Sequence, residues 1–292
     1  MLKKISKTTG SLSPSATKDS ESTPKINSID FTASDDGANF DAFKELATLL
    51  NLPLWKIKDE CCLFQIKNLM AKIGKVMVRY STTEKELEKM LYNVNQLAVG
   101  TILIAPAYIP NTVRYAKKQN HNGPKIHSII DFPFGESLFK SKLSDIKESI
   151  KLVNGATVVI PCMLLSPKNL RTLKRQVRAI GRFKKIITGI GISAMDMNEW
   201  QIKTLFRVVE KSKINHVTFL FGEVSEAELK EKMQVINKYK CRKAIKVLGS
   251  VQTIGAVQEL IALSVDEILT PYADQIGADL IKRFNIKTIN LK

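Results

Sequence analysis

Eight short runs rich in β-branched residues alternate with amphipathic helical segments, and this alternation constrains the fold more than any other feature of the chain. The predicted strands are 75–80, 101–105, 125–131, 156–161, 184–190, 216–221, 244–249 and 265–270. The predicted helices are 83–97, 109–119, 139–153, 167–181, 197–212, 224–238, 251–262 and 273–283. Because the strands lack strict polar–apolar alternation, we expect parallel strands buried on both faces. The pattern predicts an α/β fold, a closed (β/α)₈ barrel, with a doubly wound open sheet as the alternative.

Three regions are expected along the chain. Residues 1–37 are rich in Ser, Thr, Lys and Asp without apolar periodicity, so we predict a disordered tail. Residues 38–73 place Phe40 and Phe43 at helical spacing and are predicted as a helical extension. Residues 74–292 are predicted as the barrel, whose function would lie at the C-terminal ends of the strands and in the loops that follow.

The charge of the chain favours anionic partners. The formal net charge is +17, and residues 1–37 carry five lysines against five acids, so the excess lies in residues 38–292. Residues 149–195 hold nine basic side chains and no acid. Within them, the 168–185 surface is interpreted either as a weak nucleic-acid or polyanion footprint or as an ordinary solvated helix face.

The cysteine and histidine content argues against a metal centre. The four cysteines, two of them neighbours, form no metal-binding spacing, and the chain has only three histidines. No apolar run approaches the ~20 residues needed to cross a bilayer. We therefore expect a cytoplasmic protein with free thiols, no metal, no cofactor and no membrane association. A homodimer is left open.

Five segments, in order along the chain, resemble the deoxyribose-phosphate aldolase family. They begin at Thr83 (TEKEL), Ile104 (IAPAYIP), Ile129 (IIDFPFG), Asn154 (NGA) and Ile245 (IKVLGSVQT). The resemblance implies the same barrel and a carbon–carbon lyase that acts on deoxyribose 5-phosphate. In that chemistry, a lysine on strand six forms a Schiff base with the substrate carbonyl, and a carboxylate on strand four moves protons.

The two residues that carry this chemistry are absent at the matching positions. Thr218 stands at the place of the nucleophilic lysine, and residues 214–229 contain no lysine at all. A hydroxyl cannot form an imine. Ile160 stands at the place of the carboxylate, and no acid occurs in residues 149–195. The sequence therefore predicts that Schiff-base activity has been lost.

Lys246 matches the family's second lysine, on strand seven. Three roles are open for it: binding an anion, pairing with a carboxylate such as Asp131, or acting as a substitute nucleophile. The first two are favoured, because a lone lysine without a neighbouring cation stays protonated.

The resemblance places phosphate binding in the loops after strands seven and eight, at Gly249, Ser250 and Thr270. Pro271 removes a backbone donor there and Leu269 adds bulk, so we expect reduced phosphate affinity.

The leading hypothesis is an aldolase-like pseudoenzyme, or a protein that binds a phosphosugar or another small anion. Its pocket would be lined by Lys246, Thr218, Asp131, Gly249, Ser250 and Thr270. The first alternative is an active aldolase that uses Lys246, and the second is a polyanion binder that uses the 168–185 surface.

Overall fold

A computed structural model describes residues 67–78, 83–118, 123–239 and 241–283, all within one structural unit, Trp55–Lys292. The predicted tail and most of the predicted helical extension lie outside the described residues. Among the described residues, no helix is long and apolar enough to cross a membrane.

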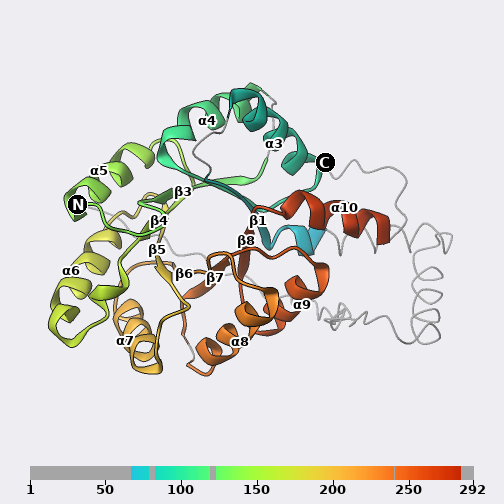
Figure 1. The fold of residues 1–292 in the computed structure, drawn as a ribbon. Coiled ribbons are helices and arrows are strands. Elements are labelled where there is room, and N and C mark those ends of the chain that lie inside the picture. Colours follow the sequence, from blue (N-terminus) through green and yellow to red (C-terminus); the bar gives the residue numbers. More distant parts are fainter. Residues whose placement is uncertain (1–66, 79–82, 119–122, 240, 284–292) are drawn as a thin grey trace, which may run out of the picture. The chain divides into compact units, whose positions relative to one another are not determined.

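Eight parallel strands close into a barrel in sequential order, β1 to β8, and β1 pairs with β8 (Figure 1). The strands are β1 (Ile73–Met77), β2 (Thr101–Ile104), β3 (Lys125–Ile130), β4 (Gly155–Val159), β5 (Ile187–Ser193), β6 (His216–Leu220), β7 (Ala244–Leu248) and β8 (Glu267–Thr270). The (β/α)₈ prediction is confirmed.

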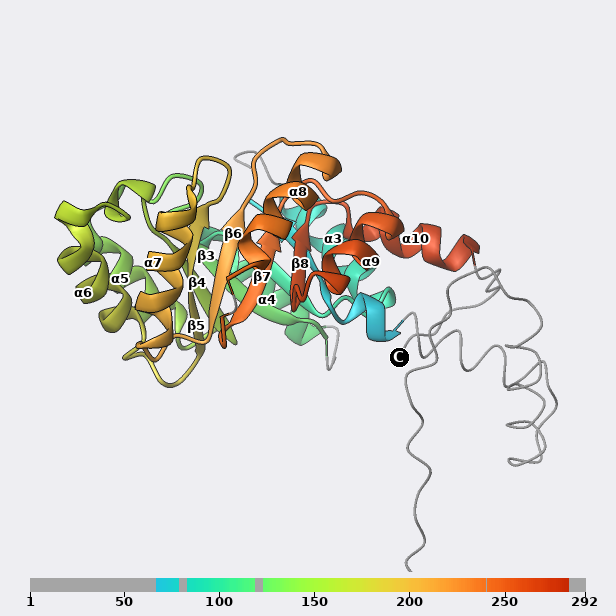
Figure 2. The ribbon, with the colours of Figure 1, turned by 90° about the horizontal axis from the view of Figure 1, so that it is seen from below.

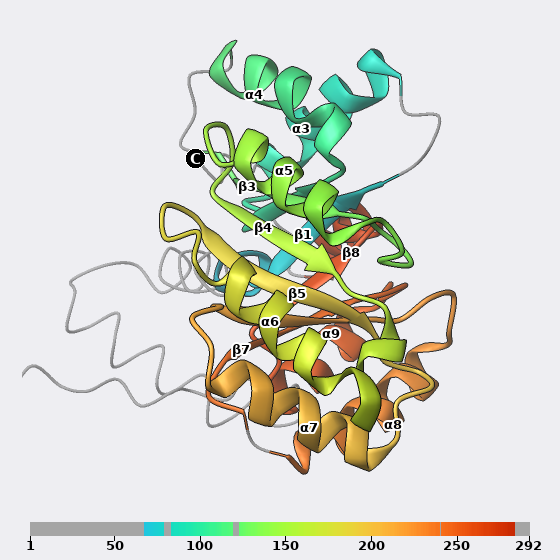
Figure 3. The ribbon, with the colours of Figure 1, turned by 90° about the vertical axis from the view of Figure 1, so that its left-hand side faces the viewer.

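A helix follows each strand and lies on the outside of the barrel, as Figure 2 and Figure 3 show from two sides. The helices are α3 (Glu84–Gln96), α4 (Ile109–Lys118), α5 (Phe139–Ser149), α6 (Leu170–Ile180), α7 (Glu199–Glu210), α8 (Glu226–Asn237), α9 (Ile254–Ala262) and α10 (Ala273–Arg283). Three of them begin with a capping box, in which Thr83, Asn198 or Ser225 bonds the third helical residue and is bonded by it. These caps fix where α3, α7 and α8 start.

Strand residues alternate between two hydrophobic cores. Side chains such as Ile104, Ile190 and Val247 point outward and pack under the helices. The intervening side chains point into the barrel, where Leu103 and Leu248 belong to a separate inner cluster. A strand side chain in the inner cluster therefore points into the barrel, and one in the outer core points toward the helices.

Strand β5 begins three residues later than predicted. Gly189 and Gly191 lie inside the strand. A Cβ on Gly189 would lie 2.3 Å from the His216 ring. Here glycine makes room for an imidazole inside the barrel.

Three Asn or Asp residues tie neighbouring strands together at the N-terminal end of the barrel. Each stands immediately before an even-numbered strand, and its side-chain oxygen accepts a hydrogen bond from a backbone N–H of the preceding strand. Its own N–H donates back to the carbonyl of that same residue. The pairs are Asn154 with Ile126, Asn215 with Thr188 and Asp266 with Ile245, at 2.7–2.9 Å. The backbone donors at these strand starts are thereby satisfied.

Candidate functional site

Polar side chains fill the part of the barrel interior nearer the N-terminal ends of the strands. This polar layer consists of Thr101, His127, Thr157, His216, Thr218, Lys246 and Glu267. Contacts across the barrel show that these side chains meet. The rings of His127 and His216 stack with centroids 6.4 Å apart, and Thr157 Oγ1 lies 2.9 Å from His216 Nε2 in a hydrogen bond.

Lys246 and Glu267 form an ion pair within the polar layer. They are Cα partners on the neighbouring strands β7 and β8, and their side chains are 8% and 12% exposed. Burial acts to raise the pKa of Glu267, but the charge and the hydrogen bond of Lys246 outweigh it and hold the pKa below its ordinary value. The Lys246 ammonium therefore has a partner inside the barrel.

The two histidines are neutral at ordinary pH. Burial, reinforced by the charge of Lys246, lowers the pKa of His127 to about 4 and that of His216 well below its usual range. A Cβ on Gly155 would lie 2.8 Å from the His127 ring, and a Cβ on Gly189 would lie similarly close to the His216 ring. Both imidazole rings therefore occupy space that a glycine leaves free. The polar layer is filled by its own side chains.

Several atoms of the polar layer have no hydrogen-bond partner among the described residues. They are His127 Nε2, His216 Nδ1, Thr218 Oγ1 and Glu267 Oε1. Unsatisfied buried polar atoms cost stability, so the polar layer is not optimised for stability alone.

An apolar layer covers the polar layer on the side of the C-terminal strand ends. It consists of Val76, Leu103, Ile129, Val159, Leu220, Leu248 and Leu269, with Val78 and Phe132 packed against it. Leu248 follows Lys246 by two residues on the same strand, and Leu220 follows Thr218 in the same way, so each polar side chain has an apolar one above it. Packed hydrocarbon therefore lies between the polar layer and the C-terminal strand ends, where barrels of this kind bind substrates.

Asp131 lies at the end of β3 and is bonded within its own loop. It accepts hydrogen bonds from Ser137 N and Ser137 Oγ at 2.9 and 2.7 Å and pairs with Lys142 at 2.8 Å. Burial alone would raise the pKa of Asp131, but the bonds from Lys142 and Ser137 hold it below its ordinary value. The predicted pairing of Asp131 with Lys246 is wrong, because the charge that reaches Asp131 comes from α5.

A carboxylate of the chain itself occupies the backbone donors after β7. Glu226 Oε1 accepts hydrogen bonds from Gln252 N and Thr253 N at 2.6 and 2.9 Å, and Glu226 Oε2 accepts one from Thr253 Oγ1 at 2.7 Å. Burial opposes ionisation of Glu226, yet these bonds keep its pKa below the ordinary value. The start of α9, where an anion would bind, holds an internal anion.

The predicted phosphate residues are also engaged in the fold. Gly249 N donates to Leu269 O at 3.1 Å. Thr270 is fully buried, and its hydroxyl donates to Val251 O at 2.7 Å and accepts from Tyr272 N at 3.2 Å. Ser250 is half-buried in the same loop as Gly249. Two groups of predicted site residues are brought together: Lys246 with Thr218, as Cα partners on β7 and β6, and the loop of Gly249 and Ser250 with the end of β8 at Thr270.

Comparison with known proteins identifies the relatives of this barrel. No family model matches the chain. The deoxyribose-phosphate aldolase of Mycoplasmoides pirum is 24% identical over 200 residues, which cover 66% of this chain and 88% of that protein. The enzyme of the same name from Treponema denticola is 22% identical over 201 residues, which cover 67% and 92%. The chain is thus similar in sequence to two deoxyribose-phosphate aldolases over most of their length.

A solved structure agrees with this relationship at the level of the fold. QR15, an aldolase, superimposes with a TM-score of 0.67 at 16% identity and covers 76% of this chain and 99% of its own. The resemblance inferred from five short segments is therefore confirmed.

The structure places two of the positions that the sequence resemblance singled out. Thr218 lies beside Lys246, as its Cα partner on β6. Ile160, which directly follows β4, packs in the outer core. The inward residues of β4 are Gly155, Thr157 and Val159, none of them acidic.

Sequence reasoning missed Glu267, Glu226 and the two interior histidines as parts of this region. Only the register of β7 with β8 shows that Glu267 faces Lys246. Among the described residues, no three His, Cys, Asp or Glu side chains gather as a metal site. Cys162 and Cys241 are free thiols.

Proposed function

We propose that this chain is an aldolase-like barrel that does not carry out Schiff-base chemistry. The observation that carries the proposal is the Lys246–Glu267 ion pair, buried beneath the apolar layer with Thr218 as its neighbour. An amine must be deprotonated and reach the carbonyl to form an imine. Lys246 is ion-paired with Glu267, and the apolar layer lies between it and the C-terminal strand ends.

We also propose that the barrel does not bind a phosphosugar at the C-terminal strand ends. A sugar phosphate at the mouth would have to displace Glu226 from the start of α9 and would meet Leu248 and Leu269 where it needs space. The pseudoenzyme hypothesis is therefore favoured over a phosphosugar-binding protein and over an aldolase that uses Lys246. A homodimer and a cytoplasmic location remain predictions.

The test is chemical trapping. The full chain is incubated with deoxyribose 5-phosphate and sodium borohydride, and its intact mass is measured beside that of a Lys246→Met variant. An imine forms with loss of water, and hydride reduces its C=N bond to a stable amine. We expect the fraction of protein that carries a trapped adduct to be at background level, and equal, in the wild type and the variant.

An adduct in the wild-type chain that disappears in Lys246→Met would overturn the proposal and establish Lys246 as a nucleophile. An adduct that persists in the variant and maps to one other lysine would also overturn it. Background labelling spread over exposed lysines agrees with the proposal.

A further inference from the structure

The loops at the N-terminal ends of β4 to β7 carry a concentration of positive charge. These four loops are residues 150–154, 181–186, 211–215 and 238–243. The described residues of these loops include nine Lys and Arg residues and no Asp or Glu. The charge therefore lies at the N-terminal end of the barrel, opposite to the C-terminal strand ends.

A cavity of about 400 Å³ opens among three of these loops. Its lining combines cations with amide and aromatic groups: Asn154, Phe183, Lys184, Lys185, Lys213 and Asn215. The side-chain oxygens of the two asparagines accept backbone hydrogen bonds, so their amide nitrogens add donors to the three ammonium groups. Such a lining suits an anionic oxygen-rich group such as a phosphate.

The lysines that line the cavity have no carboxylate partner among the described residues. Lys184, Lys185 and Lys213 are exposed, and none of them forms an ion pair with a carboxylate among the described residues. Lys142 and Lys246, in contrast, are buried and paired. Unpaired cations that gather on one face produce a positive potential that attracts a polyanion.

Helix α6 extends this charge along the outside of the barrel. Its buried stripe of Leu173, Val177 and Ile180 leaves a basic side exposed to solvent. That side and the loop after it carry Arg171, Lys174, Arg175, Arg178 and Arg182, all exposed. On the helix itself, Arg171 and Arg178 are seven positions apart, about 10 Å at the helical rise. Because α6 ends at the loop 181–186, the arginines lead directly to the cavity.

We propose that this basic face, made of α6 and the four loops, binds nucleic acid through its phosphate backbone. This inference goes beyond the proposed function and does not depend on it. The extent of the charge exceeds what one phosphate needs and fits several successive phosphates of a strand. Binding through phosphates alone is independent of base sequence.

A lipid surface is the less favoured partner. Membrane-surface proteins commonly insert exposed aromatic side chains at the interface. On the basic face, Phe183 is half-buried, and the half-buried Tyr239 lies under Lys203 at 4.9 Å. The exposed apolar residues there, Leu152 and Ile187, are only 43% and 37% exposed.

The test measures binding of the full chain to a short fluorescein-labelled DNA duplex of random sequence by anisotropy. Affinity should fall steeply with salt, at least about tenfold from 50 to 200 mM, since several counterions are released on binding. A triple variant, Lys184→Glu, Lys185→Glu and Lys213→Glu, should bind at least about tenfold more weakly and with a shallower salt dependence.

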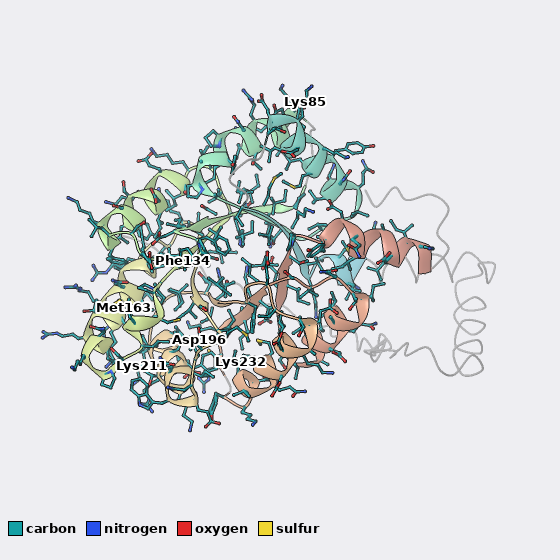
Figure 4. All side chains as sticks on the ribbon, viewed as in Figure 1. Lys85, Phe134, Met163, Asp196, Lys211 and Lys232 are labelled. Atoms are coloured by element: carbon teal, nitrogen blue, oxygen red, sulfur yellow. The ribbon has the colours of Figure 1, made fainter. Side chains whose placement is uncertain are left out.

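The matched control is Lys85→Glu, Lys89→Glu and Lys117→Glu, which changes the net charge equally on α3 and α4. Figure 4 shows Lys85 on the far side of the barrel from Lys211, which belongs to the basic face. All six lysines are exposed, so both variants should keep the circular dichroism spectrum of the wild type. The control should bind DNA within about threefold of the wild type, because charges beyond the Debye length contribute little.

Three results would overturn the inference. They are no binding by the wild type at 50 mM salt, equal weakening in both triple variants, and binding to phosphatidylserine vesicles without binding to DNA. The second would mean that net charge alone attracts DNA, and the third that the face serves a membrane.

Discussion

The apolar layer and the polar layer occupy the same barrel, one above the other, but they are built by opposite rules. The apolar layer packs seven aliphatic side chains, which contribute stability by burial alone. The polar layer holds an ion pair, two neutral histidines and atoms without partners. Buried polar groups of this kind seldom add net stability compared with hydrocarbon of the same volume. The comparison teaches that one layer holds the barrel together while the other is tolerated because its charges are paired.

The largest effect is expected from unpairing the polar layer. In Glu267→Leu the Lys246 ammonium loses its only carboxylate partner among the described residues, which should cost about 3–5 kcal/mol of unfolding free energy. Urea denaturation monitored by circular dichroism measures this loss.

The double variant Lys246→Met with Glu267→Leu is the control for that experiment. Replacing both members of a buried pair by apolar residues is often neutral, so most of the lost stability should return. A double variant as unstable as the single one would show that the polar layer itself stabilises the barrel.

A smaller effect is expected in the apolar layer. Leu248→Ala removes buried methyl groups and leaves a cavity, and we expect a loss of about 3 kcal/mol. Because no titrating group is removed, the loss should be equal at pH 5 and pH 8. A pH-dependent loss would mean that the apolar layer controls ionisation below it.

The smallest effect is a change in slope with pH. The pKa of His127 is lowered to about 4 from an ordinary value of 6.5, so between these values the unfolded chain binds a proton that the folded chain does not. Stability should therefore fall as the pH drops from about 6.5 toward 4, by on the order of 1.4 kcal/mol per pH unit for one such histidine.

His127→Asn should remove that share of the slope. The measurement is unfolding free energy from urea titrations at several pH values, and the slope is compared, since the variant also loses packing. Identical slopes in the two proteins would show that folding does not lower the pKa of His127.

The sequence predicted the barrel well because its signals are local. Alternating strands and helices, and loops with the right lengths, placed every strand, and only β5 was displaced by three residues. Only the neighbouring His216 ring explains why glycine stands inside a strand.

The site was less predictable because its pairings are not local. Lys246 faces Glu267 through strand register, while Asp131, which the sequence offered as partner, is taken by Lys142. Thr270 belongs to the outward-facing set of β8, so its hydroxyl closes a loop. Whether a strand side chain points into the barrel or toward the helices depends on its position to within one residue. A strand sequence without polar–apolar alternation does not reveal which side it faces.

The Asn and Asp ties at the N-terminal strand ends have a consequence for where the chain can be divided. They join β3 to β4, β5 to β6 and β7 to β8, so those six strands are fastened two by two. A break in α6 leaves every tie inside one fragment, whereas a break in α5 parts Asn154 from Ile126. The modular unit of this part of the barrel is thus a βαβ unit, two parallel strands joined by one helix. Split or circularly permuted versions should be cut between these units.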